Sequence, residues 1–264
     1  SSRNNTKLQF TKSKIRIIMG AFGGPNIVED GLVFAADAWN EQCWQPNTST
    51  SGSCTSLINS LEYTGSLLND VSGSLGEAGS WVFNGTNDFI NFPNDIGVNG
   101  LTEASCFCWV NSDSIAVNKA IAVKWDYDTQ GCFGFQTDNS SVGELRVFIA
   151  NAADDNGSRY TYTSDANLAS TTWYCVGFTY DGSQGASNDR IEIYVDGVKK
   201  AKSYSGTIAT SLFAATSTFK IGQFGGTIND RWWNGKIANC QIYNKALTAA
   251  EALQNYNATK NRFI

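Results

Sequence analysis

The segment 171–201, TTWYCVGFTYDGSQGASNDRIEIYVDGVKKA, contains two runs of alternating apolar residues separated by a polar loop. Successive side chains of a strand point to opposite faces of a sheet, so each run predicts a strand with one buried face. Asp196 and Gly197 follow the second run, and this pair tolerates the positive φ angles of a tight hairpin turn. The segment therefore predicts a strand meander. The alternating apolar residues are Tyr174, Val176, Phe178 and Tyr180, then Ile191, Ile193 and Val195.

Short apolar runs separated by loops rich in Gly, Asn and Asp recur along the rest of the chain. Strands at this density favour a two-sheet antiparallel sandwich. We expect residues 81–83 and 89–92 to form a hairpin around the turn 84–88. The polar segment 40–80 is expected to be a long surface excursion with one short element near 57–63. Further strands are expected at 31–38, 105–110, 120–125, 133–137, 144–150, 160–163, 219–223 and 236–243.

One short helix is expected at the C-terminal end of the chain. Thr248 and Glu251 are three residues apart. This spacing is typical of a capping box, in which each side chain accepts a hydrogen bond from a backbone N–H at the start of the helix. The sequence therefore predicts a helix that begins just after Thr248.

Length and composition describe one ordered domain. A chain of 264 residues can bury a single large sandwich core. No run of about 18 apolar residues occurs, so we expect no membrane insertion. The net charge of −5 argues against nucleic acid as a partner, because duplex binding depends on concentrated Lys and Arg.

The first 24 residues differ from the remainder in charge, because five cations precede the first acidic residue, Glu29. We interpret residues 1–24 as a basic N-terminal arm, which is either a solvated tail or a segment that docks on a partner subunit. The sandwich domain is then expected over 25–264. The cations of the arm are Arg3, Lys7, Lys12, Lys14 and Arg16.

Seven cysteines and no histidine limit the disulfide and metal chemistry. The odd number excludes complete pairing within one chain, and the lack of histidine excludes a Cys/His zinc site. Cys43 and Cys54 lie in the polar segment and form the expected disulfide if the environment is oxidising. Four other cysteines lie in apolar strand-like runs and are expected to be small core residues: Cys106, Cys108, Cys175 and Cys240.

The chain resembles laminin-G-like domains, the jelly-roll sandwiches of the concanavalin A-like group, from about residue 25 to 263. The pieces that carry the resemblance are 31–38 (GLVFAADA), 83–90 (FNGTNDFI), the meander, and 233–248 (WNGKIANCQIYNKALT). The ends, 24–33 (GPNIVEDGLV) and 254–263 (QNYNATKNRF), are similar to those of laminin-G-like domains in virion structural proteins of tailed bacteriophages. This resemblance implies a capsid decoration, head-fibre or tail component on the virion surface, attached to other virion proteins through the arm. Because sandwich proteins on particles often associate around symmetry axes, a homo-oligomer is also expected.

The same resemblance implies loops at one rim that hold Ca²⁺ and bind glycans. Carboxylate and amide oxygens suit Ca²⁺, although loop aspartates are also common as plain turn formers. The candidate metal ligands are Asp126, Asp128, Asp154, Asp155 and Asn156. Trp233 is expected in the core. The aromatic residues expected on loops, where they could stack on sugar rings, are Trp125, Tyr127 and Trp232.

Catalysis is not expected. Glycoside hydrolysis needs two carboxylates on either side of the scissile bond, and the Glu-x-Asp-x-x-Glu strand expected of sandwich-fold hydrolases does not occur. The lack of histidine also excludes the common arrangements of a nucleophile with a histidine base. Two functions remain. The first is the virion structural protein, whose lectin-like sandwich binds glycans or neighbouring subunits, and the second is a secreted or cell-surface Ca²⁺-dependent lectin domain with an extracellular location.

Overall fold

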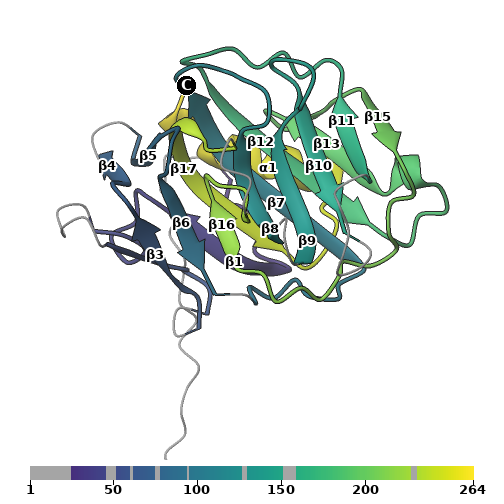
Figure 1. Cartoon of the computed structure of the whole chain (residues 1–264), viewed down its shortest axis with the longest axis horizontal. Helices are drawn as coiled ribbons and strands as arrows, with labels where there is room; N and C mark the ends of the chain where they lie inside the picture. Colours follow the sequence, from purple (N-terminus) through teal and green to yellow (C-terminus); the bar gives the residue numbers. More distant parts are fainter. Residues whose placement is uncertain are drawn as a thin grey trace, which may run out of the picture.

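The computed structural model describes residues 25–45, 52–59, 62–74, 78–93, 95–126, 130–150, 159–226 and 231–264. Within these residues the chain forms two antiparallel sheets that pack face to face, and one α-helix, α1 (Ala249–Thr259), near the C-terminus (Figure 1). The expected all-β sandwich is confirmed. The arm with its five cations lies outside the described residues. No helix in the described part of the chain has the length and apolar character needed to cross a membrane.

The first sheet contains the meander predicted from the sequence. Phe178 of β12 lies opposite Ile193 of β13, and the turn that follows has φ of 52° at Asp196 and 74° at Gly197. The strand order is β14 (Val198–Lys199), β13 (Ile191–Val195), β12 (Trp173–Asp181), β7 (Glu103–Ser112), β17 (Asn234–Tyr243), β5 (Ser80–Asn84) and β4 (Ser72–Ser74), and β1 (Leu32–Asp37) also pairs with β17.

The second sheet lies in front of the first in Figure 1, where β6, β16, β8, β9 and β10 run side by side. Its strand order is β15 (Lys202–Ser205), β11 (Tyr160–Thr163), β10 (Leu145–Ile149), β9 (Gln130–Thr137), β8 (Ala120–Asp126), β16 (Phe219–Ile221), β6 (Phe89–Phe92), β3 (Thr64–Leu68) and β2 (Ser53–Thr55).

Aromatic and aliphatic side chains from both sheets fill the space between them. The ring of Phe34, from β1 of the first sheet, lies 4.8 Å from the ring of Phe92 and 5.4 Å from that of Phe219, both in the second sheet. Edge-to-face packing of this kind adds to the stabilisation from apolar burial. The four cysteines expected as core residues are all buried, and Trp233 is fully buried as expected.

Two expectations about residues 40–92 are wrong. The turn 84–88 does not join a hairpin, because β5 belongs to the first sheet and β6 to the second. Asp88 accepts a hydrogen bond of 3.0 Å from the Asn84 backbone at this crossing. The segment 40–80 is also not a mere surface excursion. It supplies β2, β3 and β4, and the side chains of Trp44 and Leu67 are buried in the core. Even a short apolar run in a polar segment is buried when it packs against the edge of a sheet, because burial removes its apolar surface from water.

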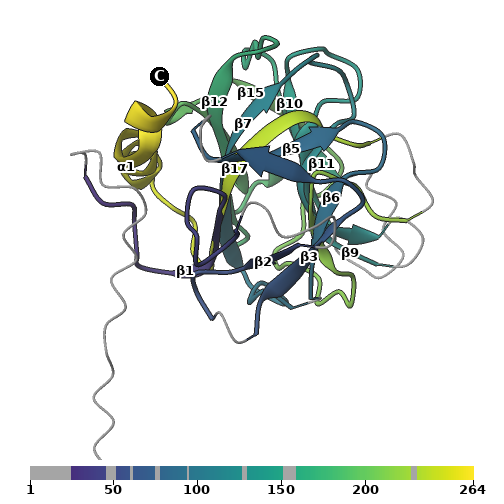
Figure 2. The same ribbon diagram turned by 90° about the vertical axis from the view of Figure 1, so that its left-hand side faces the viewer.

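The C-terminal helix covers the outer side of the first sheet, opposite the second sheet (Figure 2). Its capping box is formed as predicted, since Thr248 accepts from the Glu251 backbone and Glu251 accepts from the Thr248 backbone. The indole of Trp109 in β7 stacks on Phe263 at 4.2 Å and donates to the Thr259 hydroxyl at 2.8 Å. The helix thus shields apolar side chains that would otherwise face solvent.

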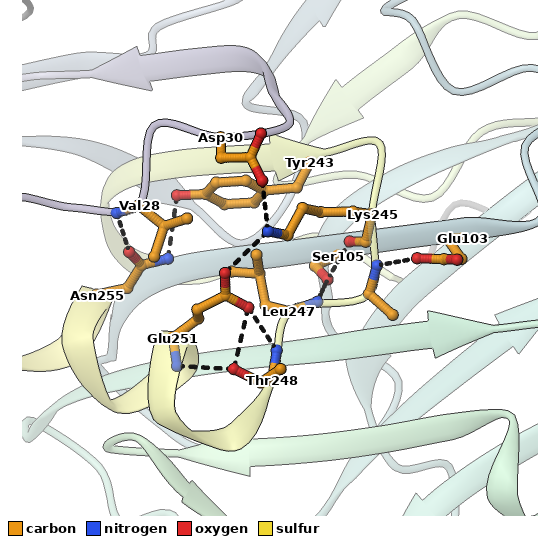
Figure 3. Close-up of polar contacts among 11 residues, drawn as sticks. Val28, Asp30, Glu103, Ser105, Tyr243, Lys245, Leu247, Thr248, Glu251 and Asn255 are labelled. Carbon is orange, nitrogen blue, oxygen red and sulfur yellow. Dashed lines mark hydrogen bonds and ion pairs between the residues drawn. The ribbon is translucent and has the colours of Figure 1, made fainter.

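Polar contacts connect the helix to the beginning of the described chain (Figure 3). The Val28 backbone N–H donates to the Asn255 side chain at 2.8 Å, and Asn255 donates to the Tyr243 hydroxyl at 3.0 Å. Lys245 lies between Asp30 and Glu251, at 2.7 and 2.8 Å. The segment before β1 and the C-terminal helix are therefore both held on the outer side of the first sheet, and the outer face of the second sheet is not covered by this helix.

Candidate functional site

The outer face of the second sheet carries a group of polar and aromatic side chains on β9, β10 and β11. Strand alternation explains its origin: Leu145, Val147 and Ile149 point into the core, so Arg146 and Phe148 point outward. The strand register places Arg146 opposite Gln136 of β9 and opposite Tyr162 of β11. Three neighbouring strands thus bring one cation, one amide and one phenol together.

The Arg146 side chain is held in a defined position. Its guanidinium carbon lies 3.9 Å from the centre of the Tyr160 ring, which is the geometry of a cation–π contact. Its Nε donates to the Asp138 carboxylate at 2.6 Å, and a terminal nitrogen donates to the Asn139 side chain. With only 4% of its surface exposed, Arg146 is a fixed element of this face and not a mobile surface cation.

Asp138 is the carboxylate that orients Arg146. Burial acts to raise the pKa of Asp138, but hydrogen bonds from Ser140 and the charge of Arg146 outweigh it, so the pKa is lowered overall. The Ser140 hydroxyl and backbone N–H donate at 2.8 and 3.0 Å. An aspartate with a lowered pKa is ionised at neutral pH and cannot act as a general acid there. Its chemistry is therefore that of a hydrogen-bond acceptor.

Two tyrosines complete the group, which we call the Arg146 surface: Asn139, Tyr160 and Tyr162 reach solvent, and Arg146 and the fully buried Gln136 lie beneath them. The rings of Tyr160 and Tyr162 are partly exposed, their centres lie 6.0 Å apart, and Asn139 is exposed beside them. Aromatic rings offer an apolar face with a polar tip, and a few fixed polar groups give a ligand its orientation. This combination suits a ligand with alternating C–H and O–H groups.

The tryptophans expected on loops are not placed for stacking on a ligand. Trp125 belongs to β8 and is 1% exposed, with its ring centre 6.1 Å from those of Phe148 and Phe224. Trp232 is 8% exposed and lies 5.7 Å from the Phe89 ring. Neither ring is free to stack on a ligand, because Trp125 lies in a strand instead of a loop and neighbouring aromatic rings cover both. Tyr127 lies outside the described residues.

The candidate Ca²⁺ ligands are described only in part. Asp126 ends β8 beside Gly225, near the ammonium group of Lys220. Burial lowers the pKa of Lys220, and the negative charge of Asp126 acts to raise it. A cation already adjacent to Asp126 opposes the approach of a second one. Asp128, Asp154, Asp155 and Asn156 lie outside the described residues. Calcium binding at these loops therefore remains a prediction.

Three buried thiols form a cluster that the sequence did not indicate. Among the described residues, the one group of three metal-capable side chains is Cys106, Cys108 and Cys240, whose sulfur atoms lie within 4.8 Å of one another. Cys106 and Cys108 share a face of β7, and β17 places Cys240 opposite Cys108. The sequence places only Cys106 and Cys108 on one face of a strand; Cys240 joins them through strand pairing, which no short spacing motif reveals.

A hollow of about 200 Å³ lies beside the turn that follows β1. Trp44, one of its lining residues, is 5% exposed, and the other lining side chains are mostly polar. Its position between the turn and β2 was not indicated by the sequence. The lining residues are Glu41, Gln42, Cys43, Trp44, Gln45, Ser53 and Thr55.

Comparison with solved structures places the fold among known sandwiches. Domain 4 of AbnA, an extracellular arabinanase from Geobacillus stearothermophilus solved with arabinotriose, is 19% identical to this chain with a TM-score of 0.51. The match covers 87% of this chain and 100% of that domain. Trypanosoma rangeli sialidase with 2,3-difluorosialic acid is 14% identical with a TM-score of 0.57, and the match covers 91% of this chain and 37% of that chain. The binding domain of Paraclostridial Mosquitocidal Protein 1 is 14% identical with a TM-score of 0.59, covering 86% of this chain and 52% of that chain.

At such low identity these likenesses show a shared fold and nothing finer, and the chain spans only about a third of the sialidase. No curated protein matches the sequence. The family model described as the concanavalin A-like lectin/glucanases superfamily matches residues 84–252, which is more than half of the chain and runs from the crossing after β5 into α1. From this match and from the two-sheet sandwich, the chain belongs to the concanavalin A-like lectin/glucanases superfamily.

Proposed function

We propose that the protein is a non-catalytic carbohydrate-binding domain and that the glycan lies on the Arg146 surface. The observation that carries the proposal is the pair of partly exposed tyrosine rings beside an arginine fixed by Asp138 and Asn139. The rings present apolar faces to sugar C–H groups, while Asn139 and the phenol groups offer hydrogen bonds to hydroxyls. A related fold takes a sugar in the arabinanase domain, which was solved with arabinotriose.

The proposal excludes hydrolysis at this surface because its carboxylates are engaged in structural contacts. Asp138 is held ionised by Ser140 and Arg146. Glu144, directly before β10, accepts from the Thr163 hydroxyl at 2.5 Å and from the Ala166 backbone at 2.9 Å. A glycosidase needs one carboxyl group protonated and free to reach the leaving oxygen, with a second one facing it. Neither carboxylate meets that need.

Binding of soluble polysaccharides to the full chain tests the proposal. We expect Tyr162→Ala and Tyr160→Ala each to weaken binding roughly three- to tenfold, the range of one aromatic contact. Tyr204→Ala is the matched control, because Tyr204 lies on the neighbouring strand β15, is 47% exposed, and is opposite the inward-facing Thr161. Equal affinity of all variants, or release of shortened sugars, would contradict the proposal. Adding EDTA to the same titration tests the expected Ca²⁺ dependence.

We further propose that this domain is carried on a phage virion, from the resemblance of the chain ends, and that it is a homo-oligomer attached through the basic residues 1–24. No described residue bears on that placement, and a secreted or cell-surface lectin accounts for the same fold. Mass spectrometry of purified particles tests it directly. The chain should be found in the particle and should be lost from it when residues 1–24 are deleted; its absence from particles would leave the extracellular lectin.

A further inference from the structure

The thiols of Cys43 and Cys54 lie in direct contact at the edge of the sandwich. Cys43 is in the turn that follows β1 of the first sheet, and Cys54 is in β2, the edge strand of the second sheet. Their sulfur atoms are 3.1 Å apart, and the two residues are 3% and 0% exposed. A disulfide bond is about 2.05 Å long, so bond formation requires the sulfurs to approach by only about 1 Å.

The surrounding backbone already holds the two segments together. The Thr55 N–H donates to the Cys43 carbonyl at 2.8 Å, directly beside the sulfurs. The Asp37 N–H donates to the Cys43 sulfur at 3.3 Å, which orients that side chain from the end of β1. On its other side β2 pairs with β3, where Cys54 lies opposite Gly65. A covalent bond at this place therefore needs no rearrangement of the strands.

No other cysteine pair combines these features. Cys106 and Cys240 are 4.0 Å apart, on adjacent central strands of the first sheet, and share their site with a third thiol. These three thiols offer no single preferred pair, and Cys132, in β9 of the second sheet, is not part of their cluster. Cys175 lies in a separate cluster under α1. The edge position distinguishes the pair of Cys43 and Cys54.

We propose that Cys43 and Cys54 form a disulfide bond that joins the two sheets in the mature protein. The two thiols lose two electrons and two protons to a disulfide oxidant of the glutathione type, whose S–S bond breaks to give two thiols. Because both sulfurs are covered in the folded chain, the bond forms during folding. Burial and the neighbouring Cys43 thiol raise the pKa of Cys54 well above its ordinary value, so few thiolates exist to exchange once the fold is complete.

The bond has two consequences. It secures a three-residue edge strand, β2, whose backbone has a pairing partner on only one side. It also fixes the turn that lines the 200 Å³ hollow beside β2. Since such bonds persist in oxidising compartments, the disulfide implies maturation outside a reducing cytoplasm. Of the two settings proposed above, this favours the secreted or cell-surface domain over a virion protein assembled in a reducing cytoplasm.

The number and identity of the bonds are measured on the full chain. The reduced, unfolded chain is refolded in glutathione and glutathione disulfide, then unfolded again and alkylated without reductant. We expect one bridge between the peptides that contain Cys43 and Cys54, and alkylation at the other five of the seven cysteines. Alkylation at all seven, or a bridge between any other pair, would overturn the proposal.

Thermal unfolding provides a second measurement. The oxidised chain should unfold roughly 5–10 °C above the reduced chain, as expected for closing a short loop in a domain of this size. The double variant Cys43→Ala/Cys54→Ala should lose this difference, and Cys175→Ala, the control for removing a buried thiol elsewhere, should keep it. Equal melting temperatures of oxidised and reduced wild type would contradict the stabilising role.

Discussion

Arg262 illustrates how one buried charge joins three distant parts of the chain. Its guanidinium donates to both oxygens of the Asp37 carboxylate, at 2.8 and 2.9 Å, and also to the Ala78 carbonyl. The two side chains of this ion pair are 5% and 3% exposed. Burial raises the pKa of Asp37, while the charge of Arg262 and the Trp39 N–H oppose that rise. A pair so completely buried is costly to separate, because either charge alone would lie in an apolar environment.

Removing one partner of this pair should destabilise the domain strongly. We expect Asp37→Asn or Arg262→Met to lower the free energy of unfolding by about 3–5 kcal/mol, the usual cost of an uncompensated buried charge. The combined variant should cost less than the sum of both single changes, since no charge is left alone. Urea unfolding measures all three.

The exposed pair of Asp30 and Lys245 supplies the control, because the Asp30 side chain is 84% exposed. Asp30→Asn should leave the unfolding midpoint almost unchanged, since water screens such a pair. If Asp37→Asn behaved like Asp30→Asn, the buried contact would not contribute to stability.

At the scale of elements, α1 is the piece of structure added to the outer side of the sandwich. Its start depends on the capping box, and its polar contacts reach β17 and the segment before β1 (Figure 3). The hydrogen bond from Lys245, followed by that from the Thr248 N–H, lowers the pKa of Glu251. Its last turn and the residues that follow cover Trp109 through Tyr256 and Phe263. Loss of the helix would therefore expose an aromatic face of the first sheet.

Thr248→Ala should weaken the start of this helix. The change removes the side-chain acceptor for the Glu251 N–H, and we expect the unfolding free energy to fall by about 1 kcal/mol. Thr248→Ser keeps the acceptor and should remain near wild type. Chemical denaturation of the three proteins measures the difference. A Thr248→Ala protein as stable as Thr248→Ser would mean that packing alone holds the helix.

The charge distribution decides how the whole molecule responds to pH. The pKa of Asp138 is lowered overall by Ser140 and Arg146 against the effect of burial, and hydrogen bonds from Ser183 and Gln184 lower that of Asp181. The pKa of Glu251 is also lowered. A carboxyl group whose pKa is lower in the folded state stabilises the fold above its ordinary pKa and loses that effect as the pH falls. The chain also contains no histidine.

We therefore expect the melting temperature to fall as the pH drops below about 4, because the unfolded chain then takes up protons on these carboxylates more readily than the folded chain does. Between about pH 6 and 7.5 it should change little, because the chain has no side chain of histidine type to titrate there. Melting curves across pH 2–8 check both parts. Glu251→Gln should show a shallower acid decline than wild type. A steep step near neutral pH would contradict this account.

From its composition, the sequence predicts that the site binds a ligand and does not catalyse a reaction. It does not predict which residues form the site. The lack of histidine and of a paired-carboxylate strand indicated a binding role from the residues themselves. Tyr160 and Tyr162 carry no distinguishing signal in the sequence, because they alternate as in any half-buried strand. Trp125 and Trp232 are large aromatics beside polar segments, so the sequence predicts them to be exposed, and only their neighbours in the fold show that they are buried.

The alternating strands, the Asp196–Gly197 turn and the capping box at Thr248 depend on residues a few positions apart, so the amino-acid sequence predicts them. The pairing of strands depends on packing across the whole domain. That packing places β5 and β6 in different sheets, Arg146 against Tyr160, and Cys43 against Cys54. The reason is physical. Backbone conformation follows local sterics and turn chemistry, whereas burial and side-chain contact depend on partners brought together from distant parts of the chain.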